Sequence, residues 1–161
     1  MRSLRLGKSF KDHSIHFLLA SVFGLGKAPA APGTVATLFA GVPCFLVVGR
    51  FPWPVQLFFA GALFWIGWYA SGKAERQLGR IDPGEIVIDE LCGYLVAMAG
   101  HAVSFSSILT GFLLFRLFDI WKPWPIRSVE RGLTGGASIM TDDVLAGIYA
   151  NVLGLIVLKL V

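Results

Sequence analysis

The sequence predicts an all-α fold, a polytopic membrane bundle of about five spanning helices with an interfacial helix before them. Of the 161 residues, 55% are hydrophobic and 15% are charged, and the mean hydropathy is +0.70. Soluble domains carry about 25% charged residues. The apolar segments also lack the residue-by-residue alternation of strands that close into membrane barrels. The composition therefore favours an integral membrane protein over the alternative, an unusually apolar soluble helical domain.

The N-terminal segment has the pattern of a helix that lies at a membrane surface. Apolar residues from Ile15 to Val22 recur at the i, i+3, i+4 and i+7 positions of one helical face. The apolar run is roughly eleven residues long, short of the about 20 that a spanning helix needs. Basic residues precede it, namely Arg2, Arg5, Lys8 and Lys11. Residues 1–33 are expected to form a cytoplasmic or interfacial helix and a Gly/Pro loop.

Longer apolar segments follow, and residues 34–161 are expected to form the membrane bundle of one single domain, 1–161. The segments cover residues 34–50, 52–72, 86–104, 106–121 and 143–161. We find no convincing internal repeat among them.

The Lys and Arg residues predict the orientation of this bundle. With a cytoplasmic N-terminus, eleven of the 14 basic residues fall in cytoplasmic segments; Arg50 and Lys159 fall outside, and Arg116 lies within a span. This bias agrees with the positive-inside rule. Most of the acidic residues then gather at the cytoplasmic ends of the spans or in the loops before them: Asp82, Glu85, Asp89, Glu90, Asp119, Asp142 and Asp143.

The stretch DPGEIVIDELCGY (82–94) places Asp89 and Glu90 in the first turns of an apolar helix. Carboxylates near a helix N-terminus are stabilised by the helix dipole. That account suffices for Asp82 or Glu85, which precede the helix. It explains Asp89 and Glu90 less well, because they lie among Ile, Val, Leu and Cys, and ionisable residues within a span are candidates for function.

The stretch GGASIMTDDVLAG (135–147) repeats this arrangement. Thr141 is a plausible N-cap, with Asp142 and Asp143 in the first turn of the helix. The dipole explains one aspartate well. Two adjacent aspartates after a Gly-Gly loop, at the same membrane face, favour a metal site.

The stretch FRLFDIWKPWPIR (115–127) brings charges into a third apolar helix. Arg116 and Asp119 share one helical face and could simply neutralise each other. Lys122 follows one turn later near the interface, and Pro123 and Pro125 end the helix. We favour participation of these charges in a shared acidic centre over a self-contained ion pair.

The stretch GLGKAPAAPGTVAT (24–37) is a Gly/Pro loop that leads into a helix near Thr34. Free N–H groups at a helix start attract phosphate, and Lys27 would add positive charge. The spacing is not that of a P-loop, and a rigid turn explains the stretch equally well.

Carboxylates clustered beside cations suit divalent-metal phosphate chemistry. Mg²⁺ prefers oxygen ligands, and proteins hold it with a few carboxylates, waters and substrate phosphates. The bound metal neutralises phosphoryl oxygens and can activate water, while Lys and Arg bind the phosphate.

Taken together, the blocks GLGKAPAAPGT, IVIDELCGY, FRLFDIWKPWPIR and GGASIMTDDVLAG resemble the phosphatidylglycerophosphatase A family, in family order and over about residues 22–150. The resemblance implies a Mg²⁺-dependent phosphatase of the bacterial inner (cytoplasmic) membrane. Its reaction removes the terminal phosphate of phosphatidylglycerophosphate and yields phosphatidylglycerol, a step of phospholipid synthesis. The implied partners are the phospholipid substrate and the membrane, with no nucleic acid.

Carried over by position, the family's acidic pattern falls on Asp82, Asp89, Glu90, Asp119, Asp142 and Asp143. Its basic and loop pattern falls on Lys27, Gly33, Thr34, Arg116, Lys122 and Arg127. We expect the metal-binding and catalytic groups to be Asp89, Glu90, Asp119, Asp142 and Asp143, and the second pattern to hold the substrate phosphate. The resemblance leaves open which acid binds metal and which activates water.

A small ion or proton transporter is the main alternative, since it could use the same intramembrane charges. Transporters often contain inverted repeats and broken helices near mid-membrane. Here the acids gather at one face and no repeat is evident, so the phosphatase is favoured. A non-catalytic membrane subunit would leave these carboxylates unexplained.

Overall fold

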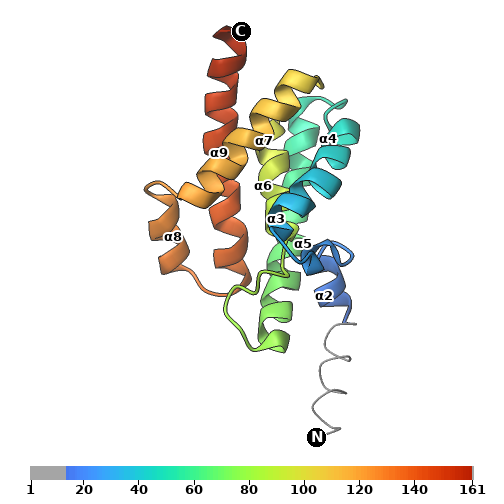
Figure 1. The fold of residues 1–161 in the computed structure, drawn as a ribbon, viewed down its shortest axis with the longest axis vertical. Coiled ribbons are helices and arrows are strands. Elements are labelled where there is room, and N and C mark those ends of the chain that lie inside the picture. The colour runs from blue at the N-terminus through green and yellow to red at the C-terminus, as the bar shows by residue number, and fades with distance from the viewer. Residues whose placement is uncertain (1–13, 161) are drawn as a thin grey trace, which may run out of the picture.

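The computed structural model describes residues 14–160, and this part of the chain is helical without any strand (Figure 1). The predicted all-α class is confirmed, whereas Arg2, Arg5, Lys8 and Lys11 lie outside the described residues. The helical elements are α2 (Ile15–Ala20), η1 (Leu25–Lys27), α3 (Pro32–Ala36), η2 (Thr37–Gly41), α4 (Val42–Val48), α5 (Trp53–Leu78), α6 (Ile88–Met98), α7 (Phe105–Trp121), α8 (Ile126–Gly132) and α9 (Gly136–Leu160).

Several predicted segments reappear as helices with different bounds. The segment 34–50 is the run α3–η2–α4, which begins at Pro32 rather than near Thr34, and α5 continues past residue 72 until Gly79 ends it with a φ of 68°. The predicted N-cap at Thr141 is wrong, because α9 already begins at Gly136. Asp142 and Asp143 therefore lie inside a helix and not in its first turn.

The prediction of five spans is not confirmed. Among the described helices, α9 alone is long and apolar enough to cross a membrane by length and composition, a criterion that core helices of soluble proteins also meet. Helix α6 has 11 residues, about 16 Å at 1.5 Å per residue, whereas a membrane core is about 30 Å thick. The segment 86–104 is thus shorter as a helix than its apolar sequence suggests.

Helix α6 lies at the centre of the bundle and packs against α9, α5, α7 and the run α3–η2–α4 (Figure 1). Its contact with α9 is the most extensive and depends on two glycines. A methyl group at Gly93 would come within 2.6 Å of the Asp143 carbonyl oxygen, and one at Gly147 would collide with the Gly93 carbonyl. Small residues let helix backbones approach closely, so α6 and α9 cross here almost in backbone contact.

The opposite end of the α6–α9 contact is fixed by a polar side chain. Asn151 Nδ2 donates to the carbonyl oxygens of Ala97 and Ala99 at 2.9 and 2.8 Å, and lies 3.3 Å from that of Val96. The last carbonyls of a helix have no partner within the helix. Asn151 supplies the missing hydrogen-bond donor from α9, and the contact fixes the register of the two helices.

Candidate active site

Three carboxylates meet beside the crossing of α6 and α9. Asp89, Glu90 and Asp143 can place one ligand oxygen each within 4.8 Å of one another. Asp89 precedes Gly93 by four residues, and Asp143 precedes Gly147 by four, so each aspartate lies one turn before a crossing glycine on the same helix face. The close approach of the backbones therefore brings the side chains together.

The carboxylates of this cluster are largely buried and could hold a cation. Asp89 and Asp143 are only 8% and 3% exposed. Asp89 Oδ1, Glu90 Oε2 and Asp143 Oδ2 are buried and accept no hydrogen bond from the described residues. Buried polar atoms are normally hydrogen-bonded, and buried charges are paired or coordinate metals. The oxygen donors and their missing partners fit a hard divalent cation such as Mg²⁺.

An arginine and a fourth carboxylate adjoin this cluster from α7. Arg116 Nη1 lies 2.6 Å from Asp119 Oδ2 and 4.0 Å from Glu90 Oε1. Asp119 is also close enough to interact with the carboxyl group of Asp143. The predicted pair Arg116–Asp119 is thus present, but it is not self-contained, because both of its members face the carboxylate cluster.

The N-terminal loop reaches the same place through Gly33. A methyl group at Gly33 would collide with Glu90 Oε1 and would lie 3.1 Å from Arg116 Nη1. The start of α3 therefore packs directly on the Glu90–Arg116 contact. Thr34 is the next, half-buried residue of α3.

Lys122 joins α7, α8 and α9. It ends α7 in the left-handed conformation with a φ of 46°, and its Nζ donates to Asp142 Oδ2 at 2.5 Å and to Glu130 Oε1 at 3.0 Å. Burial alone would lower the pKa of Lys122, but the hydrogen bonds and charges of Asp142 and Glu130 outweigh burial and raise it. Lys122 is therefore firmly cationic.

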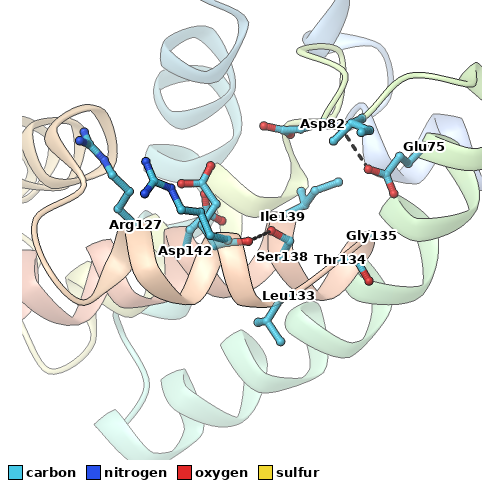
Figure 2. A pocket seen from close by; sticks show the side chains of 12 residues that line it. Glu75, Asp82, Arg127, Leu133, Thr134, Gly135, Ser138, Ile139 and Asp142 are labelled. Carbon is cyan, nitrogen blue, oxygen red and sulfur yellow. Dashed lines mark hydrogen bonds between the residues drawn. The ribbon is translucent and has the colours of Figure 1, made fainter.

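A cavity of about 530 Å³ opens beside Asp142 (Figure 2). Asp142 Oδ1 is buried without a hydrogen-bond partner among the described residues. Arg127 and Asp82 line the same cavity, and Arg127 also donates to the Trp121 carbonyl at 3.3 Å. Asp142 thus presents one oxygen to Lys122 and keeps the other free.

Not every predicted residue lies at the carboxylate cluster. Lys27 packs with its Nζ 5.1 Å from the centroid of the Phe17 ring, and its charge acts on Glu85. Glu85 itself pairs with Arg80 at 2.6 Å, which lowers the pKa of this carboxyl group. Arg80 and Glu85 belong to the loop before α6, and Lys27 of η1 lies beside that loop.

Sequence reasoning missed two acids at the site. Glu130 binds Lys122, and Glu75 accepts a hydrogen bond from the Asp82 backbone N–H at 3.2 Å in the wall of the cavity. Each lies in a charged stretch near Arg76 or Arg131, where an exposed acid is the ordinary expectation. No local sequence pattern marked either residue as part of the site.

This combination of buried carboxylates, an arginine and a lysine in a helical bundle defines a site suited to binding and cleaving phosphate esters. The chain belongs to the phosphatidylglycerophosphatase A family, whose sequence model matches residues 18–158. It is therefore an enzyme of a phosphatase family, and this match leaves the transporter interpretation without support.

Curated relatives agree with this membership. The chain is 37% identical over 134 residues to phosphatidylglycerophosphatase A of Escherichia coli (strain K12), covering 83% of this chain and 77% of the relative. It is 40% identical over 134 residues to phosphatidylglycerophosphatase A of Haemophilus influenzae, covering 83% and 82%. A Bacteroides thetaiotaomicron protein whose name proposes it as a phosphatidylinositol-3-phosphatase is 35% identical over 143 residues, covering 84% and 89%. No solved structure matches the chain.

Proposed function

We propose that this enzyme hydrolyses the terminal phosphate monoester of phosphatidylglycerophosphate in a Mg²⁺-dependent reaction that yields phosphatidylglycerol and inorganic phosphate. The observation that carries the proposal is the buried set of unpartnered carboxylate oxygens on Asp89, Glu90 and Asp143, with Arg116 and Lys122 beside it. Family membership and the names of two relatives support the substrate.

Each charged residue has a role that its contacts support. Asp89, Glu90 and Asp143 would hold Mg²⁺, which supplies charge neutralisation at the phosphoryl oxygens. Asp119 fixes Arg116 through their 2.6 Å ion pair, and Arg116 binds the phosphate oxygens. Guanidinium groups suit this task because they present planar pairs of N–H donors.

Asp142 and Lys122 form the second half of the proposed mechanism. Lys122 binds phosphate and donates a hydrogen bond to Asp142 Oδ2. Asp142 Oδ1 has no partner among the described side chains and takes the proton of the attacking water. The water oxygen forms the new bond to phosphorus. The bond from phosphorus to the glycerol oxygen breaks, and that oxygen leaves as an alcohol after it takes from Asp142 the proton that Asp142 received from water.

The proposed setting is the bacterial inner membrane, with several spans and the site at the cytoplasmic face. Large apolar side chains on the surface support it: Phe58, Phe105 and Ile120 are 73%, 80% and 74% exposed. Exposed apolar patches of this kind mark membrane or partner contacts. The positive-inside charge pattern supports the orientation.

The test is phosphate release by the purified enzyme in detergent micelles. We expect release from phosphatidylglycerophosphate with Mg²⁺ and none with a chelator. Phosphatidylinositol 3-phosphate is the comparison substrate because one relative's name points to it. Absence of Mg²⁺-dependent release from phosphatidylglycerophosphate by folded protein would overturn the proposal.

A further inference from the structure

A second cavity, of about 680 Å³, lies between α5 and the start of α9. The two helices approach each other here through glycines. A methyl group at Gly136 would collide with the Trp68 carbonyl oxygen, and one at Gly72 would lie 3.3 Å from the Gly136 nitrogen. The backbones form the floor of a groove whose sides are larger residues of α5.

This groove adjoins the cavity at Asp142. The two share Glu75, Thr134 and Gly135 as lining residues, and Figure 2 shows these three on the side of the cavity away from Arg127. The Glu75 carboxylate already accepts a hydrogen bond from the Asp82 N–H. Glu75 is thus part of the wall between the two spaces, and a ligand of sufficient length can occupy both.

The side chains of the groove suit an amphipathic anion. Trp65, Trp68 and Tyr69 supply aromatic surface, and such residues are enriched where a membrane meets water. Tyr69 is held in place by His16 of α2, with ring centroids 5.4 Å apart, and by Lys73, whose Nζ lies 5.6 Å from the Tyr69 centroid. These two contacts orient Tyr69 within the aromatic wall.

Arg76 adds an uncommitted positive charge to this wall. Its Nη2 would lie 3.8 Å from a methyl group at Gly72, so the guanidinium extends back along the floor of the groove. Within residues 14–160 it makes no ion pair or hydrogen bond. An arginine in this position can bind an anionic group that also carries apolar chains.

We infer that this groove binds the phosphodiester and the first part of the acyl chains of a phospholipid substrate. The inference rests on the proposed function, because the substrate's terminal phosphate would then lie in the adjoining cavity near Asp142 and Lys122. Arg76 binds the phosphodiester oxygens, and Trp65 and Trp68 contact the chains. The groove thereby selects a lipid over a soluble phosphate monoester.

The decisive variant is Arg76→Gln, with Arg50→Gln in the exposed turn between α4 and α5 as the matched control. Steady-state kinetics on phosphatidylglycerophosphate in mixed micelles should show KM about tenfold higher for Arg76→Gln, the size expected for losing a charge-assisted hydrogen bond. The value of kcat should stay within about twofold, because uniform binding affects KM alone. Inhibition by phosphatidylglycerol should weaken by the same factor, whereas inhibition by diacylglycerol, which lacks a phosphodiester, should not change.

A second variant tests the apolar part. Trp68→Ala should raise KM for long-chain substrate more than for a dihexanoyl analogue, whereas Phe58→Ala, on α5 outside the groove, should alter neither. A wild-type KM for Arg76→Gln on actively hydrolysed substrate would overturn the inference and leave the proposed function standing. If the wild-type enzyme hydrolyses no lipid phosphate, the proposed function fails. Equilibrium binding of phosphatidylglycerol then tests the groove, and equal binding by Arg76→Gln would overturn the inference.

Discussion

Gly33 of α3 packs directly against the carboxylate of Glu90 in α6, so closely that one added methyl group would strike Glu90 Oε1. The contact explains why a loop far away in the sequence belongs to the site. The contact keeps the Glu90 carboxylate near Asp89 and Asp143, because Gly33 fills the space on the other side of that carboxylate.

Gly33→Ala should therefore reduce turnover while the fold persists. The methyl group displaces Glu90 or Arg116, and a displacement of about 1 Å at a reaction centre can lower the rate about a hundredfold. Phosphate release by the purified variant measures the effect. Gly61→Ala on α5 is the control, because a methyl group there meets nothing within 4 Å; equal activity of the two variants would contradict the prediction.

Removal of metal should have a readout in stability as well as activity. A ligand that binds only the folded protein stabilises it by about 2.7 kcal/mol at a hundredfold excess over Kd. Mg²⁺ should therefore raise the Tm of the wild-type protein in detergent, and Asp89→Asn should abolish this rise. Without metal, Asp89→Asn should be at least as stable as wild type, since it removes one of several like charges.

Glu85→Gln serves as the control for this measurement, because Glu85 pairs with Arg80 in the loop before α6. Its Mg²⁺-dependent rise in Tm should match that of the wild type. An undiminished rise in Asp89→Asn would remove Asp89 from the metal site.

Glu130 should act through Lys122 and not on substrate directly. Lys122→Ala removes the ammonium group that we propose binds phosphate, and we expect KM to rise about tenfold or more. Glu130→Gln weakens the 3.0 Å contact that orients Lys122 and should raise KM by a smaller factor, about threefold. In the double variant Glu130→Gln should add nothing further, because the residue through which it acts is gone. Multiplied effects in the double variant would argue against this positioning role.

Asn151 should matter for stability and hardly for chemistry. Asn151→Leu removes the donor that binds the Ala97 and Ala99 carbonyls, which should lower the free energy of unfolding by about 1–3 kcal/mol. Unfolding in detergent measures this loss. Val152→Ala, an exposed neighbour, should cost less than about 0.5 kcal/mol. A stability of Asn151→Leu equal to that of Val152→Ala would show that the hydrogen bonds contribute little.

The fold was predictable where local sequence decides it. Helix α7 has nearly its predicted bounds, because Ser104 caps its start and proline follows its end. The start of α9 was not predictable in this way. Gly135 and Gly136 resemble a loop locally, yet Gly136 is helical and packs on the Trp68 carbonyl of α5, a contact between distant segments that no local pattern contains.

The site residues also differ in whether local sequence or only long-range packing identifies them. Asp89, Glu90 and Asp143 stand out in the sequence because a carboxylate in an apolar helix costs free energy unless it is paired or serves a function. The structure brings these three residues together. Glu75 and Glu130 lie in charged stretches, where nothing distinguishes them from exposed residues. Only the packing of α5 and α8 near Asp82 and Lys122 reveals their contacts.

Under the proposed function, the carboxylates between α6 and α9 hold the Mg²⁺ on which phosphate release depends. The most direct measurement is a Mg²⁺ titration of phosphate release from phosphatidylglycerophosphate by wild-type and Asp143→Asn proteins, both shown to be folded. The substitution keeps the size of the side chain and removes its charge. We expect saturable Mg²⁺ activation of the wild type, and for Asp143→Asn a turnover about a hundredfold or more lower with weakened Mg²⁺ activation. Equal rates and equal Mg²⁺ dependence of the two proteins would contradict the account.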